Sequence, residues 1–196
     1  PTFTLRKFTK EPFSPSKLMQ LKTVSPEMLA YLWLIIEHEA NFLVIGGTGS
    51  GKSIFSLEFL YNGISKFNEP GLYICFEEGI DSLKEDAKMF GWDFDKYEKN
   101  KKITFLYLTP YTTTDLQSLL AEEIPRSKAK RVVIDSISIF AMALNDLYRI
   151  RKQIFFLVNA LQKAGATSIL TSEIVGEAPL DISSSTRDGS FSRYGV

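Results

Sequence analysis

The sequence predicts a three-layer α/β sandwich built on a mostly parallel sheet, and three observations lead to that prediction. Short apolar segments recur along the chain, longer segments with helical patterning lie between them, and polar or glycine-rich residues follow several apolar segments directly. Apolar strands that alternate with helices indicate βαβ crossovers and a parallel sheet covered on both faces. Ligands of such folds bind at the carboxyl ends of the strands, so we expect a site there.

The first part of the chain is expected to supply an edge strand and a helix. Residues Thr2–Phe8 alternate apolar and polar side chains, which predicts a strand with one buried face. Ser25, Pro26 and Glu27 form a helix start, with a serine cap, a proline at the first helical position and an acid in the first turn. This helix is expected to run to about Glu39.

The remaining elements alternate regularly, and glycine, proline and capping residues mark their ends. We expect Asp81 to cap one helix, Pro125 to end the next and Gly165 to end the last. The predicted strands are Phe42–Ile45, Gly71–Phe76, Ile103–Leu108, Val132–Ile134 and Thr167–Leu170. The predicted helices are Lys52–Lys66, Asp81–Phe90, Thr114–Ile124 and Leu147–Ala164, and residues 176–196 are predicted to be irregular.

A glycine-rich loop follows the first apolar strand of this series. Residues Gly46–Ser53 match the pattern G-x-x-x-x-G-K-[ST] in full, with a strand before it and a helix after it. Glycines let the backbone curl so that successive N–H groups converge on phosphate oxygens, and the helix adds the positive end of its dipole. We expect Lys52 to reach the β- and γ-phosphates of ATP and Ser53 to be a ligand of Mg²⁺. The predicted nucleotide-binding residues are Gly47, Thr48, Gly49, Ser50, Gly51, Lys52, Ser53 and Ile54.

Carboxylates stand at the ends of two later strands. Asp135 ends the strand Val132–Ile134 in the Walker B pattern, and it is expected to hold Mg²⁺ through a water and to orient Ser53. Glu77 and Glu78 follow another strand, where a carboxylate can polarise the water that attacks the γ-phosphate. Adjacent side chains on an extended segment point in opposite directions, so we expect Glu77 to face the phosphate and Glu78 to help position it. A solvated acidic strand end is the alternative interpretation.

Three further features carry weaker expectations. Thr171, Ser172 and Glu173 end the last predicted strand, beside the expected γ-phosphate, where a polar side chain could sense that group or simply be solvated. Trp33 and Trp92 are expected to pack in the core rather than to stack on bases. The basic residues Arg126, Lys128, Lys130 and Arg131 are expected to form a solvated turn, with a nucleic-acid contact as the alternative.

Composition limits the classes of function. Lysine plus arginine and aspartate plus glutamate both number 23, so the net charge is zero and a nucleic-acid partner is disfavoured. Cys75 is the single cysteine, which excludes an internal disulfide and suits a cytoplasmic protein. No apolar run approaches the roughly 18 residues that a membrane span needs. His38 is the only histidine, and with no ligand cluster near it in sequence we expect a helix-end residue rather than a metal ligand.

From Ser53 onward the chain resembles the KaiC family of RecA-like P-loop ATPases. The matching stretches are SIFSLEFLYNGI, NEPGLYICFEE, MFGWDFDKYE, RVVIDSIS and RDGSFSRYGV. The resemblance implies an ATPase with a RecA-like core, often assembled as a hexameric ring, with Glu77 and Glu78 as paired catalytic glutamates. KaiC-like domains continue beyond the position of Val196 with a basic segment that reaches the next subunit's nucleotide, so ring assembly and full hydrolysis are expected to need more than this chain.

Residues 1–51 resemble a different group of ATPases. The stretches TFTLRKFTKEPFSPSKLM, SPEMLAYLWLIIE and LVIGGTGSGKS are similar to archaeal type II/IV secretion ATPases of the GspE and PilT kind. Since both families share the phosphate loop and the resemblance changes there, we hypothesise a chimera joined near Gly46–Ser53. The domain prediction is a single P-loop NTPase domain over residues 1–196, with a secretion-ATPase-like strand and helix in 1–40 and the nucleotide-binding core in 41–196.

The sequence leaves three functions open. The first is Mg²⁺-dependent binding and hydrolysis of ATP to ADP and phosphate. The second is a nucleotide-binding scaffold without significant turnover. The third is a nucleic-acid-stimulated motor or recombination-type module, which would show ATPase stimulation by single-stranded DNA that is lost at high salt.

Overall fold

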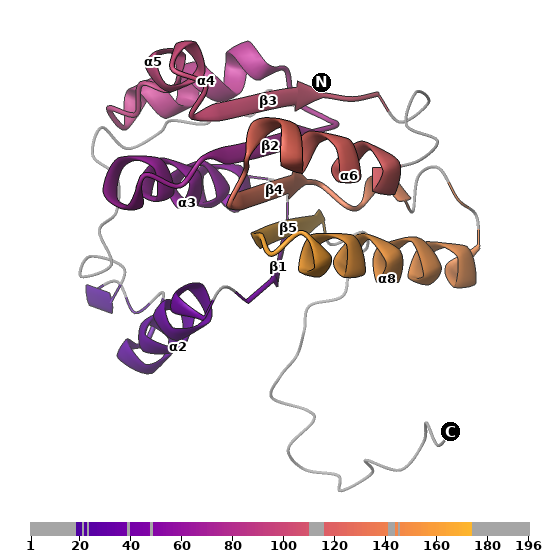
Figure 1. Ribbon diagram of the computed structural model, residues 1–196. Helices are drawn as coiled ribbons and strands as arrows, with labels where there is room; N and C mark the ends of the chain where they lie inside the picture. The colour runs from indigo at the N-terminus through magenta and orange to yellow at the C-terminus, as the bar shows by residue number, and fades with distance from the viewer. Residues whose placement is uncertain are drawn as a thin grey trace, which may run out of the picture.

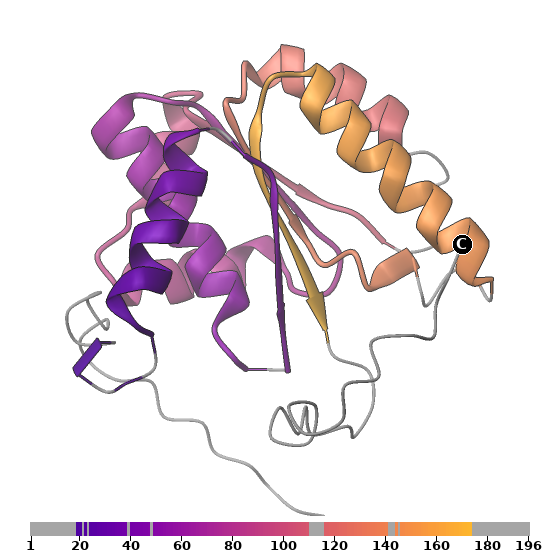
Figure 2. The same ribbon diagram turned by 90° about the horizontal axis from the view of Figure 1, so that it is seen from below.

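A five-stranded sheet lies between two helical layers in the computed structural model (Figures 1 and 2). The structure describes residues 19–20, 22, 24–38, 40–47, 49–109, 116–140, 144 and 146–173. Within them the strand order is β1-β5-β4-β2-β3, and all four neighbouring pairs are parallel. The predicted α/β/α sandwich is therefore confirmed. The predicted strand Thr2–Phe8 and the tail 176–196 lie outside the described residues.

The strands match the predicted apolar segments to within a few residues. Because all of them run in the same direction, their carboxyl ends meet at one edge of the sheet, where Gly46 pairs with Glu173 and Cys75 with Asp135. The last strand continues to Glu173, three residues beyond its predicted end at Leu170. The bounds are β1 Phe42–Gly46, β2 Gly71–Cys75, β3 Ile103–Tyr107, β4 Arg131–Asp135 and β5 Thr167–Glu173.

The helices divide between the two faces of the sheet (Figure 2). One layer holds α2 to α5, and the other holds α6 and α8. Their bounds are α2 Pro26–Glu37, α3 Lys52–Phe67, α4 Ile80–Met89, α5 Phe94–Lys99, α6 Leu116–Ser127 and α8 Leu147–Lys163. Among the described residues, none of the helices combines the length and apolar character that crossing a membrane requires.

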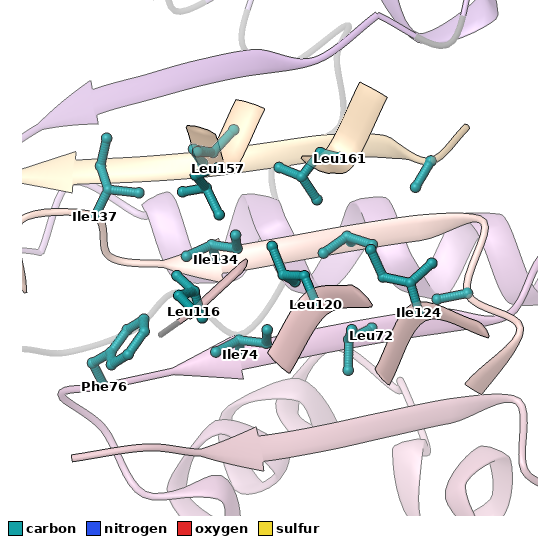
Figure 3. Packing of buried hydrophobic residues seen from close by; sticks show 14 of the residues in the cluster. Leu72, Ile74, Phe76, Leu116, Leu120, Ile124, Ile134, Ile137, Leu157 and Leu161 are labelled. Carbon is teal, nitrogen blue, oxygen red and sulfur yellow. The ribbon is translucent and has the colours of Figure 1, made fainter. Parts of the chain in front are cut away.

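Alternation along each strand sends side chains to two separate cores. Leu72 and Ile74 of β2 face α6 and α8 (Figure 3), whereas Tyr73 and Cys75 face α3 and α4. β2 is buried along its whole length because helices cover both of its faces. β1 is one of the two edge strands of the described sheet, and its residues alternate between partly buried and exposed. The strands that carry the carboxylates are therefore fixed in the middle of the sheet.

The predicted helix ends are right at α2 and wrong at α4. The Ser25 side chain accepts a hydrogen bond from the Met28 amide, and Pro26 stands at the first helical position, as expected. His38 is the exposed cap residue at the other end of α2. α4, however, begins after Gly79, and Asp81 lies inside its first turn. In that position the Asp81 carboxylate interacts favourably with the positive end of the helix dipole, although it does not cap a backbone amide.

Two other helices depart from the sequence prediction. Pro125 lies inside α6 instead of ending it. Other donors close the last turn of α6: the Ser127 hydroxyl donates to the carbonyl of Glu123, and the Ala129 amide donates to that of Ile124. The short helix α5 was not predicted at all, although Asp93 caps it by accepting from the amide of Lys96.

Two expectations about single side chains are wrong. Arg131 is only 7% exposed, so it does not belong to a solvated turn. It forms an ion pair with Glu69 at 2.6 Å and donates to the carbonyl of Phe59 at 2.9 Å. Trp33 is 72% exposed on α2, whereas Trp92 is buried as predicted and stacks on its aromatic neighbours.

Candidate nucleotide-binding site

The glycine-rich loop between β1 and α3 depends on two left-handed glycines. Gly49 has φ 74° and Gly51 has φ 88°, a region that side chains with a Cβ rarely adopt. The Ser50 amide donates to the carbonyl of Gly47 at 3.1 Å and tightens the turn. Thr48 lies outside the described residues. The loop therefore connects the end of β1 at Gly46 to the start of α3 at Lys52 in a tight turn.

The first turn of α3 leaves backbone amides without side-chain partners. Gly51 is the N-cap residue, and no side chain caps the helix there. The first amides of a helix have no partner within the helix, so those of Lys52, Ser53 and Ile54 are available to a ligand. With the dipole of a 16-residue helix behind them, these amides form a site suited to an anion.

Lys52 is held against its own loop. Its Nζ atom donates to the carbonyl oxygens of Gly46 at 2.8 Å and Gly47 at 2.9 Å, and it lies 3.5 Å from the Ser50 hydroxyl. Only 9% of the residue is exposed. An ionised phosphate oxygen is a stronger acceptor for an ammonium group than a neutral carbonyl. The ammonium is therefore already at the loop and can exchange these partners for an anion.

The Asp135 carboxylate receives hydroxyl groups from three separate elements. Ser53 of α3 donates to Oδ2 at 2.7 Å, and Tyr73 of β2 donates to the same oxygen at 2.6 Å. Thr171 of β5 donates to Oδ1. β4 lies between β2 and β5 in the sheet, which explains why its terminal carboxylate meets donors from both neighbours.

Burial keeps the groups around Asp135 protonated. It raises the pKa of the Tyr73 phenol well above its ordinary value, and the negative charge of Asp135 raises it further. The same two causes, again with burial first, raise the pKa of the Cys75 thiol to about 12. Tyr73 is therefore a permanent hydrogen-bond donor to the carboxylate, and Cys75 is not a reactive thiolate.

Both glutamates after β2 line the same cavity, which corrects the expectation that they point apart. The strand ends at Cys75, and residues 76–78 form a bend, so the alternation of an extended strand does not apply to them. Ser136 donates to Oε1 of Glu77 at 2.8 Å, which draws that carboxylate towards Asp135. Ser82 donates to Oε1 of Glu78 at 2.6 Å and ties it to α4.

A cavity of about 320 Å³ joins these groups. We call its two sides the loop wall and the acidic wall. The loop wall is Gly49, Gly51, Lys52, Ser53 and Ile54, and the acidic wall is Cys75, Glu77, Glu78, Asp86, Asp135, Ser136 and Glu173. A cation therefore faces several carboxylates across a space that can hold a phosphate chain.

Negative charge concentrates on the acidic wall. Partial burial and then the nearby carboxylates of Glu78 and Glu85 raise the pKa of Asp86. In the part of the chain that the structure describes, no three histidine, cysteine or acidic side chains cluster as a metal site. The oxygen donors that do lie together are the Ser53 hydroxyl and the Asp135 carboxylate. They suit a hard cation that takes its other ligands from water and phosphate.

Sequence reasoning missed four residues of this site, Tyr73, Cys75, Asp86 and Ser136. It also missed that Thr171 donates to Asp135. For Tyr73 a signal existed, because a tyrosine inside an apolar strand needs a partner for its hydroxyl. Thr171 was expected beside a phosphate, and its hydroxyl is instead bonded to Asp135. Ser136 and Asp86 gave no such signal, since only the fold brings them to the cavity.

A parallel sheet with this loop at the end of β1 and an acid at the end of β4, with β5 between the two strands, defines a RecA-like P-loop protein. The family model described as "ATPase: KaiC" matches residues 35–196. The chain belongs to the KaiC family.

Known proteins of this family are similar over most of the chain. The circadian clock oscillator protein KaiC of Prochlorococcus marinus subsp. pastoris is 34% identical over 164 residues, which cover 79% of this chain and 30% of that protein. The KaiC protein of Synechococcus elongatus has the same identity and coverage. The chain thus spans about 30% of the length of these curated relatives.

A solved structure supports the fold. The crystal structure of a KaiC-like protein from the hyperthermophilic archaeon Pyrococcus horikoshii aligns with a TM-score of 0.61 and 36% identity. The alignment covers 69% of this chain and 61% of that one. The family match begins at residue 35, before the phosphate loop where the two resemblances were expected to meet. The secretion-ATPase resemblance of residues 1–51, the chimera and the single-domain boundaries stay predictions.

Proposed function

We propose that this chain binds ATP together with Mg²⁺ in the cavity at the end of the sheet and hydrolyses it to ADP and phosphate. One observation carries the proposal. The Ser53 hydroxyl lies 2.7 Å from the Asp135 carboxylate at the amino end of α3, directly beside the ammonium of Lys52. Membership of a family of ATPases supports the same assignment.

The loop wall binds the triphosphate in this proposal. The amides of Gly47, Gly49, Ser50 and Gly51 and those at the start of α3, through Ile54, surround the phosphate oxygens. Lys52 leaves the carbonyl groups of Gly46 and Gly47 and donates to the β- and γ-phosphates. Its charge offsets the negative charge that develops as the γ-phosphoryl group departs.

Ser53 and Asp135 hold the metal. The Ser53 hydroxyl would keep donating its hydrogen bond to Asp135 while its oxygen served as a ligand of the cation, and Asp135 would hold the ion through water. These are oxygen donors of the kind that Mg²⁺ prefers, so the residues fit the ion. When bound, Mg²⁺ neutralises charge on the phosphate oxygens.

Glu77 orients the attacking water. The water oxygen forms a bond to the γ-phosphorus while the bond to the β–γ bridging oxygen breaks, and Glu77 accepts the hydrogen bond of the water proton. The hydrogen bond from Ser136 supports this choice, because Ser136 directly follows Asp135 and keeps Glu77 on the metal side of the cavity. Glu78, tied to Ser82, has the supporting role.

Three variants test the proposal by separating binding from turnover. Lys52→Ala should weaken binding of a fluorescent ATP analogue about a hundredfold, because charge-assisted hydrogen bonds contribute about 1.5–3 kcal/mol each. Glu77→Gln should keep wild-type binding and slow phosphate release about a hundredfold or more, the usual loss on removing a general base. Glu78→Gln is the matched control and should slow release less than Glu77→Gln.

The same measurements would reject parts of the proposal. Wild-type affinity in Lys52→Ala would overturn the binding site, and normal turnover in Glu77→Gln would overturn the role of that carboxylate. The exposure of Glu77 favours the second candidate, a nucleotide-binding module without significant turnover, since a base is most effective where water is excluded. Tight binding with phosphate release no faster than in Lys52→Ala would select that candidate.

The remaining expectations stay predictions. A ring assembly follows from the family resemblance, and the cytoplasmic location follows from cysteine content. The basic run Arg126–Arg131 had suggested a nucleic-acid contact as an alternative. Arg131 is buried in an ion pair, so one of the charges of that run is not exposed to such a partner.

A further inference from the structure

The phenol of Tyr73 shares one carboxylate oxygen with the hydroxyl of Ser53. Tyr73 is fully buried, and its OH group lies 2.6 Å from Oδ2 of Asp135, the atom that also accepts from Ser53 at 2.7 Å. Its ring stacks on Phe105 with centroids 5.7 Å apart and planes 29° from parallel. Packing therefore holds the Tyr73 ring in place, with its hydroxyl group directed at the Asp135 carboxylate.

We infer that Tyr73 is a positioning residue for the magnesium pair, fixing the Asp135 carboxylate so that it presents the Ser53 hydroxyl to the metal. The inference rests on the proposed function, because it assigns Ser53 and Asp135 to Mg²⁺. It adds a third residue, in the core of the sheet, that does not touch the metal itself.

The geometry explains why a third residue is needed. The plane of an aspartate carboxylate rotates with little resistance about its last torsion, because terminal sp³–sp² torsions are broad. Thr171 fixes Oδ1, and Tyr73 and Ser53 both bond Oδ2. If the phenol is lost, Ser53 is the only one of these donors left on Oδ2. The Asp135 carboxylate then has no partner on that oxygen other than the Ser53 hydroxyl, so it can no longer hold that hydroxyl in a fixed direction. Residues that support a metal ligand in this way typically change metal affinity by about 10–100-fold when they are replaced.

The alternative is that Tyr73 only stabilises the core between β2 and α3. A purely structural residue would affect nucleotide binding equally with and without Mg²⁺. A residue that positions the metal pair would affect only the part of the affinity that depends on the metal. The two roles can therefore be separated by a magnesium titration that does not require turnover.

The test uses Tyr73→Phe, which removes the hydroxyl and keeps the ring. Affinity for a fluorescent ATP analogue is measured in EDTA and then across a range of Mg²⁺ concentrations. We expect unchanged affinity in EDTA and a midpoint of the Mg²⁺ enhancement that is about tenfold higher than in the wild type. Tyr61→Phe is the matched control, since Tyr61 packs on Trp92 and is not among the described residues that line the cavity. Its midpoint should not move.

A double variant makes the test specific. In the Ser53→Ala background, Tyr73→Phe should add no further shift, because the hydroxyl that it positions is already absent. An unchanged or lowered midpoint in Tyr73→Phe overturns the inference, and so does an equal loss of affinity in EDTA and in Mg²⁺. If the wild type itself shows no Mg²⁺ enhancement, the proposed metal role of Ser53 and Asp135 fails first and the inference falls with it.

Discussion

The two walls of the cavity are built in different ways. The loop wall is one continuous stretch, and its geometry comes from two glycines with positive φ and the start of one helix. The acidic wall combines the stretch from the end of β2 into α4 with the ends of β4 and β5, three regions that are far apart in the sequence. Lys52 bonds carbonyl groups five and six residues away, whereas Asp135 is bonded by residues 36, 62 and 82 positions away.

This difference predicts which wall carries fold stability as well as chemistry. A loop that satisfies its own backbone can lose a side chain without disturbing the sheet. A carboxylate that accepts hydroxyl groups from three elements cannot, because its loss leaves buried donors without an acceptor. Removing the Asp135 carboxylate should therefore lower both stability and function, and removing the Lys52 side chain should act mainly on ligand binding.

The largest effect is expected for Asp135→Ala. Ser53, Tyr73 and Thr171 all lose their acceptor, and a buried unsatisfied donor costs about 1–3 kcal/mol. We expect the free energy of unfolding to fall by about 3 kcal/mol or more, and Tm by roughly 6–12 °C for a chain of this size. Urea and thermal unfolding followed by circular dichroism measure both quantities.

Two controls sharpen this result. Asp135→Asn keeps a carbonyl acceptor and should recover most of the stability, while it still loses the charge that the metal requires. Lys52→Ala should cost only about 1 kcal/mol, because water in the cavity can reach the carbonyl groups that the lysine leaves. Equal destabilisation by Asp135→Ala and Lys52→Ala would contradict the proposed difference between the walls.

A smaller effect is expected for Gly51→Ala in the loop wall. Gly51 has φ 88°, and an L-residue in a left-handed conformation costs about 1–2 kcal/mol. We expect that loss of stability, and about tenfold weaker binding of the ATP analogue if the loop moves to relieve the strain. Gly47→Ala is the control for stability, because an added Cβ at Gly47 would meet nothing within 4 Å. Identical unfolding curves for the two variants would show that the loop does not depend on this glycine.

The smallest effect is expected for Ser136→Ala. Ser136 is 2% exposed and donates to Glu77 at 2.8 Å, so its loss frees the glutamate without removing it. A hydrogen bond to a charged group contributes about 1.5–3 kcal/mol when fully formed, and Glu77 is exposed, so we expect only about a fivefold fall in phosphate release. Nucleotide affinity should not change. A variant with full turnover would indicate that Glu77 needs no support from the acidic wall.

Sequence reasoning worked where the physical cause lies within a few neighbouring residues. The cap at Ser25, the strands at Phe42 and Gly71 and the described residues of the phosphate loop follow from local backbone preferences and side-chain periodicity. The position of Asp135 next to Ser53 could be expected for a different reason. The pairing of a phosphate loop with an acid at the end of a later strand restricts the acid to a position beside the loop in this architecture.

The failures arose where neighbours in space override local preference. Arg131 carries a charge in a basic run, yet Glu69 and the ring of Phe59 surround it in the fold. Glu77 and Glu78 follow a strand, yet the chain bends there, so both reach the cavity. The partner of Arg131 lies 62 positions away and that of Glu77 lies 59 positions away, so no local pattern specifies either.

By itself, the sequence determined the layered α/β class, the strand–loop–helix unit and the residues of the loop wall, because backbone geometry and short-range hydrogen bonds depend on adjacent residues. Only the tertiary structure decided which hydroxyl groups surround Asp135, how both glutamates face the loop and which charges are buried. Those outcomes depend on the strand order β1-β5-β4-β2-β3, which brings residues from distant parts of the chain within hydrogen-bonding distance.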